Sequence, residues 1–141
     1  MEIETIEKEI KVMMIGSKDQ NGTILECIEA FDYKERIWVI LELMERETLT
    51  ILIEEHCGQY NEDFIRYVML RIVQGIAFLH SQDVVHRDLK SDNILLNDSG
   101  EIKLTGFQFS ALNVSATARR KTRLGSICWM APEIVTGQEY T

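Results

Sequence analysis

The sequence predicts a single α+β domain, and two patterns of apolar residues support that prediction. Between residues 64 and 79, apolar side chains recur at spacings of three and four, as in a helix with one buried face. Two apolar runs at 24–31 and 37–43 are instead typical of strands. The length of 141 residues, with 45% hydrophobic and 27% charged residues, fits one folded domain.

The first 43 residues predict a short helix followed by a hairpin. Residues 6–14 have the spacing of an amphipathic helix, and the polar run 16–22 predicts a loop. The two strand-like runs are separated by the polar residues 32–36, which suit a hairpin turn. We therefore expect two antiparallel strands beside the first helix.

A longer helix is expected to begin after Asn61. Its side chain is a suitable N-cap, and Glu62 and Asp63 favour the positive end of the helix dipole. One stripe of this helix should be buried, and it consists of Phe64, Val68, Ile72, Ile76 and Leu79.

Short apolar pieces follow this helix and predict strands that frame a loop. They occupy residues 84–85, 94–96 and 102–104, and the turn residues 97–100 separate the last two. Strands this short usually hold a loop that carries function, so the polar run 86–93 is the first place to search for chemistry.

Composition argues against several classes of partner. The formal net charge is −8, and residues 1–63 carry 16 acids against 6 bases, so we expect no nucleic-acid partner. No run of about 18 apolar residues is present and the N-terminus is acidic, so we expect a cytoplasmic protein without a membrane span. Cys27, Cys57 and Cys128 are spaced too widely for zinc-ligand pairs and are expected to be reduced thiols.

The loop 86–96 reads His-Arg-Asp-Leu-Lys-Ser-Asp-Asn-Ile-Leu-Leu and matches the H-R-D-L-x-x-x-N catalytic loop of protein kinases. Phosphoryl transfer to a hydroxyl needs a carboxylate near the attacking O–H and a separate oxygen ligand for magnesium. Asp88 and Asn93, five residues apart in a loop braced by strands, can point into one cleft. The alternative is a polar surface turn that matches by coincidence.

The resemblance extends nearly end to end to the PAK-like branch of the Ser/Thr protein kinases. Residues 37–43 resemble the strand and hinge of that family, 78–81 the segment before its catalytic loop, and 125–133 the end of its activation segment. This resemblance implies a partial bilobal protein-kinase fold. Residues 1–43 would form an N-lobe remnant from the αC helix to the hinge. Residues 44–141 would form the first part of the mainly helical C-lobe, through the catalytic loop, activation segment and Ala-Pro-Glu motif.

The resemblance also implies roles for residues of the catalytic loop. Asp88 would be the catalytic base, Lys90 would steady the transferring phosphoryl group, and Asn93 would bind Mg²⁺. Arg87 would be available to bind a phosphate on the activation segment. Lys90 together with Ser126 favours Ser/Thr over tyrosine as the acceptor.

The same resemblance implies an ATP site at the hinge. Leu41 would be the gatekeeper, the main chain of Glu42 to Met44 would hold the adenine, and Leu95 would contribute to the cofactor site.

Three further residues match positions of the family outside the loop. Glu9 resembles the αC glutamate that pairs with a strand lysine. The alternative is that Glu9 lies on the solvent-exposed face of its helix, as a single glutamate in a helix usually does. Thr122 matches the activation-loop phosphosite but is equally compatible with an unmodified residue in a basic loop. Glu133 ends the Ala-Pro-Glu motif.

The chain departs from the family where its Asp-Phe-Gly motif should stand. It has Gly106, Phe107 and Gln108, so the carboxylate that bridges magnesium to the phosphates is absent, while Phe107 can still pack under the first helix against Met13. A Gly-rich loop and a strand lysine are also missing from these residues. We further expect the two N-lobe strands to have an open edge, and the stripe of the long helix to lose much of its burial partner.

Three hypotheses follow from these features. The first is a PAK-like Ser/Thr kinase that uses ATP and Mg²⁺ on a protein substrate, with impaired catalysis. The second is a pseudokinase or kinase fragment that binds a substrate or partner kinase without chemistry, and the third is a decayed copy that does not fold. A small GTPase is an expected partner only through a region outside these residues.

Overall fold

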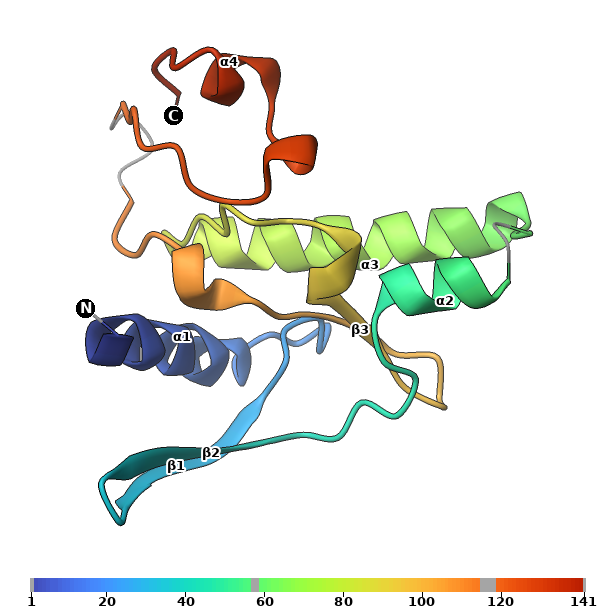
Figure 1. Cartoon of the computed structure of the whole chain (residues 1–141). Helices are drawn as coiled ribbons and strands as arrows, with labels where there is room; N and C mark the ends of the chain where they lie inside the picture. Colours follow the sequence, from blue (N-terminus) through green and yellow to red (C-terminus); the bar gives the residue numbers. More distant parts are fainter. Residues whose placement is uncertain (1, 57–58, 115–118, 141) are drawn as a thin grey trace.

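The computed structural model describes residues 2–56, 59–114 and 119–140, which form helices around two small sheets. In Figure 1, the long helix α3 (Glu62–Ser81) crosses the middle of the molecule. Helix α1 (Glu2–Gly16) and the hairpin of β1 (Cys27–Tyr33) and β2 (Arg36–Leu41) lie on one side of it. The segment that contains α4 (Pro132–Val135) lies on the other side.

Helix α1 confirms the predicted N-terminal helix and is longer than expected. Val12 is fully buried and Met13 is 4% exposed, so one face of the helix belongs to the core. The loop that follows is held by Asp19, whose carboxylate accepts hydrogen bonds from the main-chain N–H and the hydroxyl of Thr23 at 2.6 and 2.5 Å. Arg71 on α3 donates to the carbonyl of Asn21 at 2.7 Å, so this loop is tied to the long helix.

The predicted hairpin is confirmed, but β1 begins three residues later than expected. The carbonyl of Thr23 accepts a hydrogen bond from the N–H of Leu104 at 2.7 Å, and the N–H of Leu25 donates to the Leu104 carbonyl at 2.9 Å. Residues 23–25 therefore join a different strand before the hairpin starts. Lys34 and Glu35 both have positive φ, as a two-residue type I′ turn requires.

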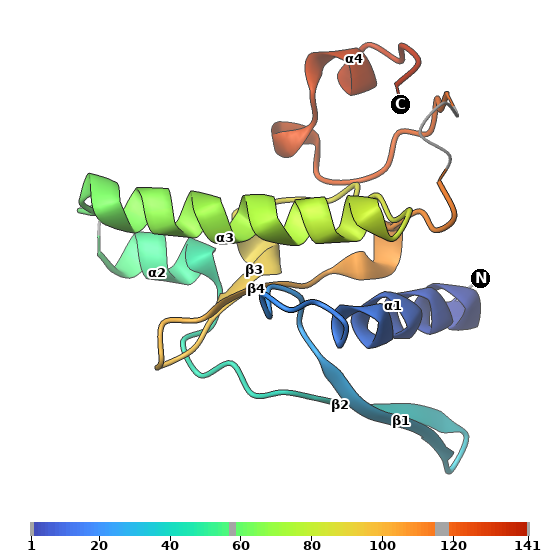
Figure 2. The same ribbon diagram turned by 180° about the vertical axis from the view of Figure 1, so that it is seen from behind.

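The open edge expected for this hairpin is present in the structure. β1 and β2 form a two-stranded sheet, with Phe31 opposite Trp38, and these side chains are 41% and 51% exposed. Figures 1 and 2 both show the hairpin projecting from the rest of the molecule. It contributes little to the core.

A helix that the sequence patterns did not predict, α2 (Leu49–Glu55), lies beside α3, as Figure 2 shows from behind. It begins at the N-cap Thr48, whose hydroxyl accepts from the N–H of Ile51 at 3.4 Å. Leu49 is buried, while Ile53 is 40% exposed.

Helix α3 confirms the predicted helix and its cap. The Asn61 side chain accepts a hydrogen bond from the N–H of Phe64 at 2.8 Å. The expected loss of burial for the predicted stripe is wrong, because Val68, Ile72 and Leu79 are at most 6% exposed, against residues that include β4. Gly75 permits this contact, since a Cβ there would lie 2.7 Å from Leu104 Cδ1. The exposed large hydrophobic side chains lie elsewhere on α3, and they are Ile65, Tyr67, Met69, Leu70 and Val73.

The two short strands β3 (Ile94–Leu96) and β4 (Ile102–Leu104) pair antiparallel, as predicted. The predicted strand at 84–85 is reduced to a single bridge between Val85 and Ala111. Both β3 and β4 lie in the core with α1 and α3. Cys27 and Cys128 are free thiols, and Cys57 lies outside the described residues. No helix within the described ranges is long and apolar enough to cross a bilayer.

Candidate active site

The predicted catalytic loop runs from the bridge at Val85 to β3, and His86 anchors it. The ring Nδ1 of His86 accepts a hydrogen bond from the N–H of Asp88 at 3.2 Å, so its other nitrogen carries the proton and donates to the Thr105 carbonyl at 2.9 Å. Burial lowers the pKa of His86 against the opposing effects of the Thr105 carbonyl and of Asp88. A neutral imidazole therefore joins the loop to the residue before Gly106.

Asp88 lies at the centre of the candidate site and is 2% exposed. Its Oδ1 accepts hydrogen bonds from the N–H and the hydroxyl of Ser126 at 2.8 and 2.9 Å. Its Oδ2 accepts from the side-chain amide of Asn93 at 3.1 Å and lies 3.5 Å from the Lys90 ammonium. Burial raises the pKa of Asp88, but these hydrogen bonds and the Lys90 charge outweigh it and hold the pKa below its ordinary value.

The activation segment reaches this carboxylate through Gly125 and Ser126. Gly125 has φ of +111°, and a Cβ there would lie 2.3 Å from the carbonyl oxygen of Arg87, so a side chain at this position would block the approach. The Lys90 ammonium donates to the Ser126 hydroxyl at 2.9 Å. The structure thus brings Asp88, Lys90, Asn93 and Ser126 into one hydrogen-bonded cluster.

Arg87 is bonded to main-chain carbonyls rather than to the predicted phosphosite. Its guanidinium donates to the carbonyls of Phe109 and Ser110 at 2.6 and 3.2 Å. Thr122 is exposed, and its carbonyl accepts a hydrogen bond from the Tyr140 hydroxyl at 2.8 Å. A contact between Arg87 and a phosphate on Thr122 stays a prediction.

The predicted metal side of the site is filled by the chain's own amide. Gly106 adopts a left-handed conformation with φ of +76°, and a Cβ there would lie 2.4 Å from both Cγ and Oδ1 of Asn93. Asn93 also donates to the Asp88 main-chain carbonyl at 2.7 Å. Among the described residues, no group of three or more His, Cys, Asp or Glu residues could hold a metal ion. The family's magnesium carboxylate has no counterpart at Gly106, and Asn93 is the remaining predicted ligand.

Glu9 lies near Phe107 rather than beside a cation. Its Oε1 accepts a hydrogen bond from the Phe107 N–H at 3.2 Å. Burial raises the pKa of Glu9, and the hydrogen bond from Phe107 opposes that effect without cancelling it. Phe107 is fully buried in the core cluster that contains Met13, as the packing prediction required.

The predicted hinge contains an ion pair that sequence reasoning missed. The Glu42 carboxylate accepts hydrogen bonds from the Lys103 ammonium at 2.7 and 2.6 Å and from the N–H of Glu26 at 2.6 Å. The partners are 61 positions apart in the sequence, which hides the pair from any local pattern. The one signal is a lysine within a strand whose residues are all buried. Leu41 is 39% exposed, while Met44 and Leu95 are half-buried.

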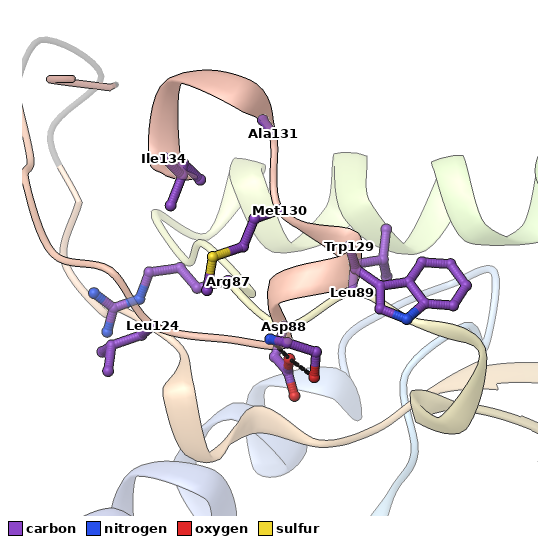
Figure 3. A pocket seen from close by; sticks show the side chains of 9 residues that line it. Arg87, Asp88, Leu89, Leu124, Trp129, Met130, Ala131 and Ile134 are labelled. Atoms are coloured by element: carbon purple, nitrogen blue, oxygen red, sulfur yellow. Dashed lines mark hydrogen bonds between the residues drawn. The ribbon is translucent and has the colours of Figure 1, made fainter. Parts of the chain in front are cut away.

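A cavity of 220 Å³ opens beside Asp88 and is shown in Figure 3. It is lined by Arg87 and Leu89 of the catalytic loop and by Trp129 and Met130 of the activation segment, and Figure 3 shows Leu89 beside Trp129. The dashed lines in Figure 3 mark the hydrogen bonds between Asp88 and Ser126. Glu133 is exposed, and its carbonyl accepts a hydrogen bond from the Thr136 hydroxyl at 3.2 Å.

Comparisons with known proteins place this geometry in a family. The protein kinase domain model matches residues 1–141. The serine/threonine-protein kinase STE20 of Saccharomyces cerevisiae is 44% identical over 137 residues, covering 97% of this chain and 14% of that protein. The serine/threonine-protein kinase PAK 1 of Mus musculus is 38% identical over 131 residues, covering 93% of this chain and 24% of that protein. The chain thus spans less than a quarter of the length of these relatives. It belongs to the protein kinase family, and it is similar to Ser/Thr kinases of the STE20 and PAK type.

Proposed function

We propose that this chain is part of a PAK-like protein Ser/Thr kinase in which transfer of the ATP γ-phosphoryl group is impaired at the metal side of the site. One observation carries this proposal. The Asp88 carboxylate is buried, ionised and bonded to Ser126, whereas the space above Gly106 is occupied by the Asn93 amide. Under this proposal, Asp88 would accept the hydroxyl proton, and no carboxylate at position 106 would bind the metal.

Asp88 would act as the hydrogen-bond acceptor for the attacking serine or threonine hydroxyl. Its lowered pKa keeps it ionised near neutral pH, and Ser126 and Asn93 fix the direction of its two oxygens. Lys90 lies 2.9 Å from the Ser126 hydroxyl, where its charge can steady a transferring phosphoryl group. These roles of Asp88 and Lys90 are assigned without reference to a metal ion.

ATP binding would fall to the hinge. We assign the adenine to the main chain of Glu42 to Met44, with Leu41 as gatekeeper and Leu95 below the ring. The Glu42 side chain is fixed by Lys103, and its main-chain N–H already donates to the Glu26 carbonyl at 3.1 Å, so the assignment rests on the family resemblance and on the other main-chain groups of the hinge. Glu9, Thr122 and Glu133 are assigned the αC, phosphosite and Ala-Pro-Glu roles of the family.

The remaining assignments rest on the family resemblance. We divide the chain into an N-lobe part, 1–43, and a C-lobe part, 44–141. A protein substrate or partner kinase, a cytoplasmic location, and a small GTPase that acts through a region outside these residues are proposed on the same basis. The net charge of −8 supports the expectation of no nucleic-acid partner.

The second candidate function is a protein-binding module without catalysis. The Asn93 amide favours it, because any side chain at position 106 must displace that amide before a carboxylate can reach a metal. A chain in this state keeps the fold of the loop and activation segment while losing the chemistry.

A four-way comparison separates the two candidates. The chain and a Gly106→Asp/Gln108→Gly version are each assayed alone and each grafted into a complete PAK-like kinase domain, with transfer of phosphate to a serine peptide as the readout. We expect activity only in the repaired graft, because metal, phosphate loop and strand lysine act as a unit. Activity of the unrepaired graft equal to that of the repaired graft would overturn the proposed impairment. An inactive repaired graft that still binds the peptide would favour the binding module.

A further inference from the structure

The loop between α1 and β1 contains Asn21 followed by Gly22, a pair that favours attack of the main-chain nitrogen on the asparagine side chain. Because glycine has no Cβ, its nitrogen is not shielded by a side chain. Gly22 has φ of +60°, and a Cβ built there would meet nothing within 4 Å. Within the described ranges, no hydrogen bond holds the side-chain amide of Asn21, since its hydrogen bonds are made by the main chain. The Cγ atom of Asn21 can therefore turn toward the Gly22 nitrogen.

The main chain of this loop is held by Asp19. Its carboxylate accepts hydrogen bonds from the N–H of Asn21 at 3.0 Å and from the N–H of Thr23 at 2.6 Å. The Gly22 N–H donates to the Asp19 main-chain carbonyl at 3.0 Å, and this bond opposes the attack because the nitrogen must leave it first. One main-chain hydrogen bond in a turn opens readily, so it slows the attack without preventing it.

Arg71 on α3 contacts the atoms that would react. Its Nη2 donates to the carbonyl oxygen of Asn21 at 2.7 Å and to that of Gly22 at 3.3 Å. If the side chain of Asn21 closes on the Gly22 nitrogen, the Asn21 main-chain carbonyl becomes one of the two ring carbonyls that water can attack. A guanidinium bonded to this oxygen stabilises the negative charge that develops on it, and therefore favours opening of the ring at this carbonyl.

We propose that Asn21 is a site of spontaneous deamidation, and that Arg71 directs the product to isoaspartate. The Gly22 nitrogen bonds to Asn21 Cγ, the bond from Cγ to Nδ2 breaks, and ammonia leaves with the proton of the Gly22 nitrogen. Water then adds to the main-chain carbonyl of residue 21, and the bond from this carbon to the Gly22 nitrogen breaks. Water supplies the oxygen of the new carboxyl group and returns a proton to the nitrogen. The chain now continues through Cγ, and the new carboxylate lies beside Arg71 as its ion-pair partner.

The modification would lengthen the main chain inside the loop that Asp19 holds. Isoaspartate adds one methylene group to the backbone between the N–H groups of residues 21 and 23, which bind the two oxygens of one carboxylate. Both hydrogen bonds cannot keep their present geometry across a longer chain. Because Arg71 ties this loop to α3, the modification should weaken the connection between α1 and α3. This inference does not depend on phosphoryl transfer.

The first test compares two asparagines of the same chain. The whole chain is incubated in mildly alkaline buffer, and peptide-mass mapping follows the replacement of each amide by a carboxyl group. Asn113 is the internal control, because it is exposed but is followed by the β-branched Val114. We expect Asn21 to deamidate at least about tenfold faster than Asn113. Equal rates at the two positions would overturn the proposed site.

The second test measures the effect on stability. Asn21→Gln keeps the main-chain hydrogen bonds of residue 21, but its longer side chain closes a less favourable ring. After equal incubation, the urea midpoint should fall in the unaltered chain and stay constant in Asn21→Gln. A midpoint that is unchanged in a fully deamidated chain would show that the loop tolerates the longer backbone, and would contradict the proposed weakening.

The third test isolates the role of Arg71. Labelling by an isoaspartate methyltransferase, combined with the mass mapping, gives the ratio of isoaspartate to aspartate at position 21. The same chain deamidated in urea gives the ratio that the local sequence alone sets, and we expect the folded chain to exceed it at least about threefold. Arg71→Met should remove this excess and Arg71→Lys should restore it, while Arg66→Met, which removes an α3 arginine bonded to Asp63, should leave the excess unchanged. Equal ratios in the folded and the urea-unfolded chain would overturn the role of Arg71.

Discussion

The candidate site has two sides, one at Asp88 and one at Gly106, and they differ in the hydrogen bonds that the chain makes there. On the side of Asp88, each carboxylate oxygen has hydrogen-bond donors from separate parts of the fold. On the side of Gly106, a carboxylate is missing and the amide of Asn93 has taken its space. The comparison teaches that the Asp88 cluster does not depend on a carboxylate at position 106, because Asp88 is held by Ser126, Lys90 and Asn93.

The largest effect should come from removing the charge of Asp88. In the repaired graft, Asp88→Asn should lower phosphate transfer by about 100- to 10,000-fold, since it removes the hydroxyl acceptor. In the unrepaired graft, where we expect no transfer above background, the same change should make no measurable difference, because the metal side already limits the reaction. Steady-state transfer to a serine peptide measures both. Asp92→Asn, an exposed change in the same loop, is the control. Equal losses in the two grafts would mean that the two sides act independently.

A smaller effect should appear in stability when a methyl group is placed above Asn93. Gly106→Ala should lower the free energy of unfolding by about 1–3 kcal/mol, from positive φ and from contact with the Asn93 amide. Gly100→Ala is the matched control, because its φ is +82° but a Cβ there meets nothing within 4 Å. The difference between the two variants, measured by urea unfolding, isolates the contact. If both cost the same, Asn93 moves aside freely and does not block the position.

Magnesium should have little effect on ATP binding to this chain. We expect Mg²⁺ to change the dissociation constant by less than about threefold, because Asn93 alone cannot bridge a metal to the phosphates. In the Gly106→Asp/Gln108→Gly variant, Mg²⁺ should tighten binding by about tenfold, or about 1.4 kcal/mol. Calorimetric titration checks both values, with adenosine as the control ligand. Strong magnesium enhancement in the unaltered chain would show that another group replaces the carboxylate.

The smallest effect concerns pH, and Asp88 and Glu9 should act with opposite sign. The pKa of Asp88 is lowered, so its stabilisation is present above its unfolded value near 3.8 and is lost as the pH falls through the folded pKa. The pKa of Glu9 is raised, so its contribution is present below its unfolded value near 4.5 and is lost as the pH rises through the folded pKa.

Glu9→Gln should therefore raise the free energy of unfolding at pH 7 relative to pH 4, by less than about 1 kcal/mol. Asp88→Asn should lower it at pH 7. Urea unfolding between pH 3 and pH 7 measures both changes. A Glu9→Gln variant with an unchanged pH profile would show that the carboxylate is not desolvated in the fold.

Local patterns predicted the elements whose signals lie within a few residues. The Asn61 cap, the periodic stripe of α3 and the polar turns of both sheets are of this kind, and the spacing of the loop correctly predicted that Asp88 and Asn93 lie together. The contact of Ser126 with Asp88 was not predicted. Helix α2 was missed because it has only seven residues, and its apolar run of Ile51, Leu52 and Ile53 is too short for periodicity to distinguish a helix from a strand.

The features that could not be predicted depend on contacts between distant segments. Leu25 does not belong to the hairpin, because its main-chain N–H donates to the Leu104 carbonyl. Whether residue 25 pairs with β2 or with β4 depends on the tertiary fold. The position of Asn93 above Gly106 likewise depends on how two loops meet, so the missing carboxylate was evident from the sequence while its replacement was not.

The ion pair of Glu42 and Lys103 has a mechanical consequence for the hairpin. The hairpin projects from the molecule, and the Glu42 carboxylate joins its base at Glu26 to β4 in the core. The Glu42 carboxylate thus fixes the orientation of the hairpin relative to the core. Because the side chains of Lys103 and Glu42 are only 10% and 22% exposed, salt screens this ion pair weakly. The hairpin should keep its orientation at ionic strengths that weaken surface ion pairs.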